Sequence, residues 1–254
     1  MATYKKRGHK PANKKERDEA IEKQSTTAGV FNTLDESASK TEQWVAKNQK
    51  HIFIVIGIVA LIALIYVSYQ QFIVGPKDKE AAEEFYMAEN YFVAAQNSTA
   101  KDSLYNLALN GGDGKYGFLG IIDNYGGTDT GNLAKYYAGM AYMNLNNPQE
   151  AIKYLKEYKT KEAVTGALAK GNIGDAYASL GQKEEALKFY KQAASFKENE
   201  FTSPVYLLKA AKIALLLKNN KEALTHLKKI KTDYPNSPEA GQVDILIARA
   251  EAGN

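Results

Sequence analysis

The stretch that decides the fold is "AKGNIGDAYASLGQKEEALKFYKQA", residues 169–193. Gly174 is followed three positions later by Tyr177, then by a Leu-Gly break and a second run that begins Glu-Glu-Ala-Leu. This order is typical of two short antiparallel helices that approach each other closely at a small residue. Residues 169–193 therefore predict a helix–turn–helix unit.

Two further copies of this pattern occur in the chain, "AKYYAGMAYMNLNNPQEAIKYLKEY" at 134–158 and "AAKIALLLKNNKEALTHLKKIKTDYP" at 210–235. A repeat of about 35 residues indicates a solenoid in which each unit buries its apolar face against the next. The small and aromatic positions that align between the copies are expected to pack the helices together. These positions are Gly139, Tyr142, Ala151, Gly174, Tyr177, Ala186, Ala211 and Ala223.

These copies resemble the tetratricopeptide repeat (TPR). The resemblance implies an all-α solenoid with repeats near 132–165, 167–200 and 204–237. Upstream, residues 116–125 are expected to form the second helix of a degenerate repeat, and 238–252 a capping helix. No segment alternates with period two for long enough to predict a strand.

A separate apolar segment precedes the repeats. Ile52 to Val74 are 23 residues without a charge, which as a helix reach roughly 34 Å, enough to cross a membrane of about 30 Å. A buried core helix or a cleaved signal peptide fits less well, because the run is apolar on every face and long. We expect a transmembrane helix at 51–75 that Gly75-Pro76 ends, with span residues Ile52, Gly57, Leu61, Leu64 and Tyr69.

The charges flanking this segment predict its orientation. Seven Lys or Arg fall in the first 17 residues, and Lys40, Lys47 and Lys50 lie close to the span. Cations gather on the cytoplasmic side of membrane proteins. We therefore expect a cytoplasmic N-terminus and a domain at 77–254 on the far side, the periplasm of a bacterial inner membrane.

Residues 1–50 are expected to be a basic and largely disordered tail, since they hold few apolar side chains. The simpler interpretation of the tail is a topology signal that also contacts anionic lipid. The alternative is that it reaches the ribosome. Residues 77–254 hold 22 Lys or Arg and 22 Asp or Glu, and this balance argues against a nucleic-acid-binding domain.

The residues favour a non-enzymatic protein without metal or cofactor. The chain has no cysteine, which excludes disulfides and thiolate zinc sites. "GGDGKYG" (111–117) has the letters of a dinucleotide fingerprint, but it lacks the preceding strand that such a site needs. The three histidines are scattered without ligand spacing.

The first helix of each repeat is expected to line a groove for a helix or an extended peptide. The alternative for any of these residues is that it fills the core between repeats. The candidate groove residues are Tyr136, Met140, Met143, Leu168, Asp175, Ala178, Leu208, Lys212 and Leu215.

The whole layout resembles the YfgM-type family, ancillary subunits of the bacterial Sec translocon. The segments "LALNG", "GFLGIIDNYG" and "GNLAKYYAG" also resemble TPR proteins of Bacteroidota. The resemblance implies association with the SecYEG channel and with a membrane-anchored periplasmic chaperone of the PpiD type. The alternative is a TPR scaffold for another assembly or secretion complex of the cell envelope.

Overall fold

The computed structural model describes the backbone of residues 26–252 and the side chains of residues 41–252. The chain divides into two compact units, 1–68 and 69–254. The basic stretch within 1–25 lies outside the described residues. Residues 26–50, expected to be part of a largely disordered tail, are instead helical, because they extend the apolar helix and a helix elongates more readily than it nucleates.

Helix α2, Thr26–Tyr69, contains residues 51–69 of the span predicted at 51–75. Its apolar window has no buried residue, and its length and composition suit a membrane crossing. Leu64, for example, leaves 65% of its surface exposed. The five residues named as span residues all lie in this helix, which is therefore a candidate transmembrane helix.

Gly75-Pro76 does not end the helix, contrary to the sequence-based expectation. A π-helical turn, η1 (Gln70–Val74), leads directly into helix α3, Gly75–Gln96. The Gly75 N–H donates to the Gln70 carbonyl, five residues back. Pro76 has no N–H and its ring would crowd the carbonyl four residues earlier, so a wider turn lets the helix continue through it.

The array begins with a layer of three helices and a hairpin. Helix α3 packs against α4 (Lys101–Asn110) and α5 (Phe118–Tyr125). Residues 116–125 were predicted as the second helix of a degenerate repeat, but α5 is the third helix of this layer, because α4 takes the place beside α3. Between them, strand β1 (Gly111–Gly112) pairs antiparallel with β2 (Lys115–Tyr116). The sequence predicted no strand here, because a two-residue ladder is too short to leave an alternating pattern.

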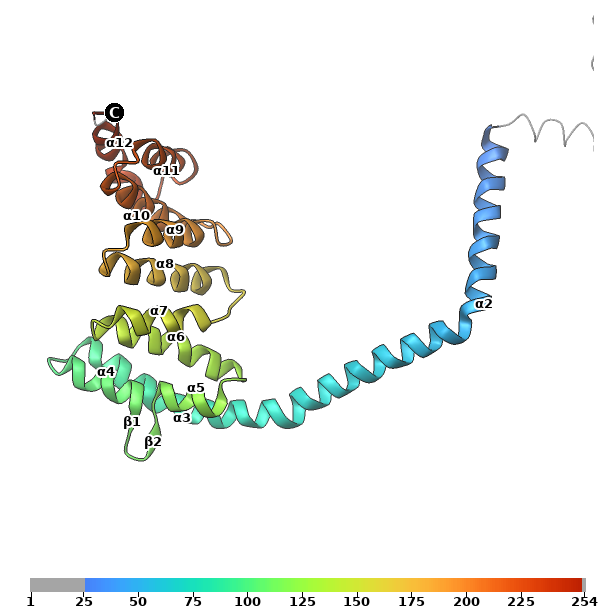
Figure 1. Cartoon of the computed structure of the whole chain (residues 1–254), viewed down its shortest axis with the longest axis horizontal. Coiled ribbons are helices and arrows are strands. Elements are labelled where there is room, and N and C mark those ends of the chain that lie inside the picture. Colours follow the sequence, from blue (N-terminus) through green and yellow to red (C-terminus); the bar gives the residue numbers. More distant parts are fainter. Residues whose placement is uncertain (1–25, 253–254) are drawn as a thin grey trace, which may run out of the picture. The chain divides into compact units, whose positions relative to one another are not determined.

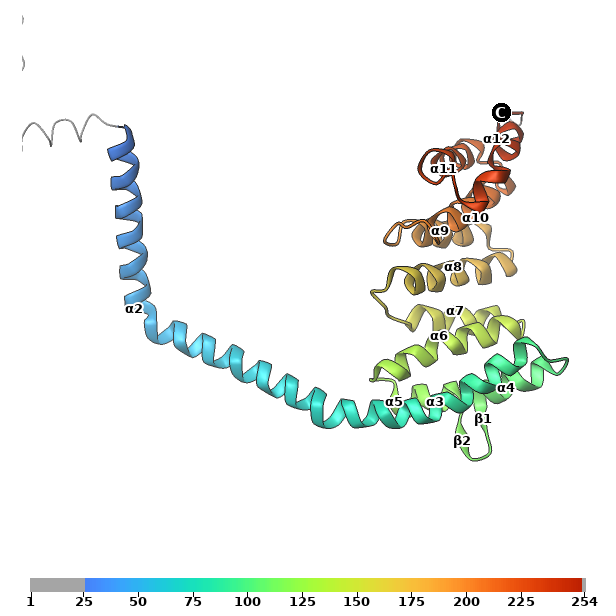
Figure 2. The ribbon, with the colours of Figure 1, turned by 180° about the vertical axis from the view of Figure 1, so that it is seen from behind.

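Three regular helix pairs follow and stack in chain order, as Figures 1 and 2 show. Within each pair the helices are antiparallel and in contact, and each pair packs against the next. The pairs are α6 (Asp129–Asn144) with α7 (Pro148–Glu157), α8 (Ala163–Ser179) with α9 (Lys183–Ala194), and α10 (Ser203–Leu216) with α11 (Asn220–Asp233).

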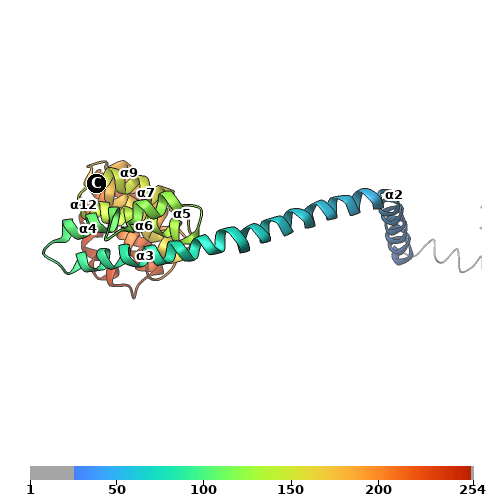
Figure 3. The same ribbon diagram turned by 90° about the horizontal axis from the view of Figure 1, so that it is seen from below.

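The far end of the array is closed as the sequence predicted. A short 3-10 turn, η2 (Pro238–Gln242), leads into helix α12, Val243–Ala252, which packs against α11. Figure 3 looks along the stack from its other end, where α3 and α4 lie nearest to the viewer. Val243 and Ala250 are the buried residues of α12.

The predicted packing positions bring the helices of a pair together. A Cβ on Gly139 would lie 2.5 Å from the Leu155 Cγ, and a Cβ on Gly174 would lie 2.7 Å from the Tyr190 ring. Both positions need glycine because the partner side chain already fills the space. The aligned alanines are fully buried; they are Ala151, Ala186, Ala211 and Ala223.

The predicted tyrosines stack on the second helix of their own pair. The rings of Tyr142 and Tyr154 are 5.5 Å apart and nearly parallel, and those of Tyr177 and Phe189 are 5.4 Å apart. The spacing is twelve residues in both repeats. The same contact in two copies confirms that the alignment has the right register.

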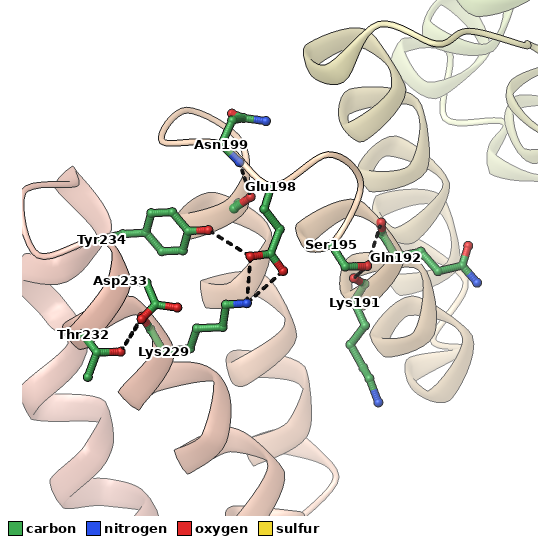
Figure 4. Close-up of polar contacts among 10 residues, drawn as sticks. Lys191, Gln192, Ser195, Glu198, Asn199, Lys229, Thr232, Asp233 and Tyr234 are labelled. Atoms are coloured by element: carbon green, nitrogen blue, oxygen red, sulfur yellow. Dashed lines mark hydrogen bonds and ion pairs between the residues drawn. The ribbon is translucent and has the colours of Figure 1, made fainter. Parts of the chain in front are cut away.

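Polar bonds hold the loop that connects the second helix pair to the third. In the loop between α9 and α10, the Glu198 carboxylate accepts from the Lys229 Nζ at 2.8 and 2.9 Å and from the Tyr234 hydroxyl at 3.5 Å (Figure 4). The Asn199 N–H donates to the Ser203 Oγ at 3.0 Å and shapes the same loop. These bonds tie the loop that connects the second pair to the third to the end of α11.

Candidate functional site

A cavity of about 330 Å³ opens where α3, α4 and α6 meet. We call it the aromatic cavity, because four of its seven lining residues are aromatic. Two of the predicted groove residues, Tyr136 and Met140, line it. The full lining is Phe92, Gln96, Tyr105, Tyr136, Tyr137, Met140 and Asn144.

The floor of the aromatic cavity is a rigid cluster of rings. The Phe92 ring lies 5.3 Å from Tyr105 and 5.2 Å from Tyr137, both edge to face. Edge-to-face pairs hold each ring in one orientation. Phe92 and Tyr105 are themselves buried, so the cavity is formed before any ligand arrives.

Tyr137 places a neutral hydroxyl beside this floor. Its hydroxyl donates to the Glu89 Oε1 at 3.0 Å. Burial, and then this bond to a carboxylate, raise the pKa of Tyr137 to about 12. The phenol therefore stays protonated at neutral pH and acts as a fixed donor rather than as an acid or a base.

The rim of the cavity reaches the next repeat. Asn172 of α8 points its side-chain amide at the Met140 sulfur, 2.9 Å away, and at the Tyr136 hydroxyl, 3.5 Å away. Gln96 and Asn144, by contrast, are exposed. An apolar floor with amides at the rim suits one apolar side chain of a peptide, whose backbone the amides can bond.

The predicted groove residues of the second repeat serve the array itself. Asp175 accepts from the Lys209 Nζ at 2.7 and 2.8 Å and from the Tyr190 hydroxyl at 2.7 Å. Burial and this bond raise the pKa of Tyr190. Leu168 and Ala178 pack, half-buried, against the core. Asp175 thus fastens α8 to α9 and α10.

Of the remaining predicted groove residues, some pack against the core and one is exposed. Met143 packs against the core between α7 and α8, and Leu215 against that of the last repeats. Leu208 is only 5% exposed, so its assignment to the groove is wrong; the neighbouring helices cover it. Lys212 is exposed, as a groove residue would be.

Sequence reasoning missed the residues that α3 and α4 contribute, because it derived the groove from the three regular repeats only. Phe85 and Phe92 are seven residues apart on α3 and both are buried. That spacing, in "FYMAENYF", is a helical signal for one inward face and could have indicated the aromatic floor.

The glycine-rich hairpin has a structural role. Glu84 of α3 accepts from the Lys115 Nζ at 2.7 Å and from the Tyr116 N–H at 2.9 Å. These two bonds lower the pKa of Glu84. The Tyr91 hydroxyl donates to Asp113 at 2.9 Å. Within the described residues, no group of three or more His, Asp or Glu is placed to hold a metal ion.

Comparison with known proteins agrees with this geometry. Models of the tetratricopeptide repeat match residues 167–200 and residues 133–162 and 206–237. No curated protein matches the chain. The chain therefore carries tetratricopeptide repeats, a fold that typically serves as a non-enzymatic scaffold for protein interactions.

Solved structures support the fold. The chain is similar to two solved structures of nearly identical TPR-like repeats from a putative kinesin light chain of Podosopora anserina, one of them a single-substitution variant. Each has a TM-score of 0.50 and 16% identity to this chain. The matches cover 70% of this chain and 87% and 88% of those chains. At this identity the likeness concerns the fold.

Proposed function

We propose that this protein is a membrane-anchored TPR adaptor of the bacterial inner membrane, with its repeats in the periplasm. The observation that carries the proposal is a preformed aromatic cavity on an array that follows a candidate membrane span within the same chain. Only six residues separate Val74, the last of the apolar run, from Ala81, the first buried residue of the array. An array tethered so closely meets partners that are themselves in the membrane.

We propose the SecYEG translocon, together with a PpiD-type membrane-anchored chaperone, as the partner. The layout of one span followed by a TPR array, which resembles the YfgM-type family, supports this choice. The aromatic cavity suits an apolar side chain of the chaperone or of an emerging substrate. The basic N-terminal segment would rest on anionic lipid or reach a ribosome docked at the same channel.

The test is photocross-linking in cells. A photoreactive phenylalanine analogue replaces Gln96 at the rim of the aromatic cavity, and, as the control, Lys228 on the exposed face of α11. The Gln96 probe is expected to form adducts with translocon subunits or the chaperone, and the Lys228 probe is not. Adding Met140→Glu should weaken the Gln96 adducts, because a carboxylate is costly to bury against the aromatic floor.

Two outcomes would overturn the proposal. Equal adducts from Gln96 and Lys228 would mean that the cavity is not the binding site. Strong Gln96 adducts with other envelope proteins alone would favour the second interpretation of the layout, a scaffold for another envelope complex.

A further inference from the structure

A second cavity, of about 280 Å³, lies where α7, α8 and α9 meet. Three lysines line it, one on α7, one in the loop after α7 and one on α8. We call it the lysine pocket and define it by Lys156, Lys159 and Lys170, with an apolar floor of Ile173, Phe189 and Phe196.

The three ammonium groups lack carboxylate partners. Within residues 41–252, the structure records no ion pair for Lys156, Lys159 or Lys170. The nearby carboxylate of Glu157 is 3.8 Å from the Nζ of Lys135. Cations that are gathered without counter-charges attract an anionic ligand.

At the equivalent position between the second and third repeats, the lysines are either paired or replaced. Lys191 aligns with Lys156 but pairs with Glu222 at 2.6 Å. Leu207 aligns with Lys170 but is buried, with 5% of its surface exposed. The array thus neutralises or fills the equivalent place one repeat later, and it leaves the lysine pocket open.

The lysine pocket is held ready for a ligand. The Lys156 Nζ donates to the Tyr177 hydroxyl at 2.7 Å, and the Lys170 Nζ lies 5.3 Å from the centre of the Phe196 ring. Asn132 bonds both sides of the Lys159 backbone, accepting from its N–H at 2.9 Å and donating to its carbonyl at 2.7 Å. Because these side chains are already held in place, binding a ligand costs less conformational entropy.

We propose that the lysine pocket binds an acidic segment of a partner protein, with one apolar side chain on the floor and carboxylates on the lysines. The volume and the apolar floor fit a single side chain. A nucleic acid is disfavoured, because residues 77–254 carry 22 Lys or Arg and 22 Asp or Glu, and such balanced charge does not suit nucleic-acid binding. This site is separate from the aromatic cavity, and the proposal does not depend on whether the translocon binds there.

The test measures the affinity of the detergent-solubilised full chain for a labelled peptide of sequence Asp-Glu-Asp-Phe-Glu-Asp by fluorescence anisotropy. Lys156→Gln combined with Lys170→Gln is expected to weaken binding at least tenfold. Lys183→Gln combined with Lys228→Gln removes the same charge elsewhere on α9 and α11 and should leave the affinity within twofold.

A second variant tests the floor. Phe196→Ala should weaken binding of the Phe-containing peptide severalfold, and should have less effect on a peptide with Ala in its place. Circular dichroism verifies that each variant keeps its helix content. The proposal is overturned if the double variant in the pocket binds like the parent, if the control variant loses as much affinity, or if a single-stranded oligonucleotide of equal charge binds more tightly than the peptide.

Discussion

At the scale of single residues, one feature recurs in every regular repeat. The turn between the two helices of a pair contains one residue with positive φ: Asn146 at 56°, Gly181 at 74° and Lys218 at 60°. In each turn the following N–H donates to a carbonyl five residues back, at 2.8, 2.9 and 2.9 Å. Glycine adopts this left-handed conformation freely, whereas lysine is strained in it.

Lys218→Gly should therefore raise the stability of the array by about 0.5–1 kcal/mol, because it relieves the strain in the last turn. Gly181→Ala should lower stability by about 1 kcal/mol for the opposite reason. Thermal unfolding of the detergent-solubilised chain, followed by circular dichroism, measures both. If Lys218→Gly melts below the parent, strain in this turn is not what limits the last repeat.

Residue spacing was enough to predict some of these roles and not others. Gly174 and Tyr177 could be assigned because their contacts lie within one helix pair, at a fixed distance along the chain. The role of Asp175 depends on Lys209, which arrives from the next repeat. The burial of Leu208 depends on the helices that pack against α10 from both sides, and the repeat pattern does not specify either contact.

At the scale of elements, α8 and α9 approach each other closely where Gly174 faces the Tyr190 ring. Gly174→Leu should destabilise the array by about 1–3 kcal/mol, because a large side chain would collide with the Tyr190 ring. Gly241→Leu in η2 is the matched control, since a Cβ there would meet nothing within 4 Å.

Urea unfolding of the two variants and the parent measures this effect. An equal midpoint for Gly174→Leu and the parent would mean that the register of the second repeat is wrong. A large loss from Gly241→Leu would indicate instead that any added bulk disturbs the chain.

The helices could be predicted from the sequence, but the connections between them could be predicted less well. The recurrence of the same small and apolar positions about every 35 residues located α6 to α11. Pro76 was expected to end the span, but the propagation of a π-helical turn past a proline depends on neighbouring backbone bonds that residue preferences do not encode. The hairpin after α4 escaped prediction because its strands, of two residues each, are too short to leave an alternating pattern.

At the scale of the whole molecule, the prediction concerns topology. The test uses a reporter that is active only in the periplasm. Fused after Asn254, it should be active; fused before Met1, it should be inactive. The reason is the excess of cations before the span. Protease added to spheroplasts should degrade the repeats.

Lys40, Lys47 and Lys50 can be replaced with Glu, together with the seven cations of the first 17 residues. In this variant, part of the protein should insert with the opposite orientation in the membrane. A reporter after Asn254 that is inactive in the parent would contradict the proposed orientation.

The shared geometry of the three turns also makes helix pairs exchangeable as cassettes. A splice that joins Asn146 directly to Gln182 removes 35 residues, 147–181, and leaves an intact joint between α6 and α9. Inserting a second copy of the same segment lengthens the array by an equal step. Each unit of a solenoid interacts mainly with its neighbours. The length of the array can therefore be changed by one helix pair at a time, while α3 at one end and α12 at the other stay unchanged.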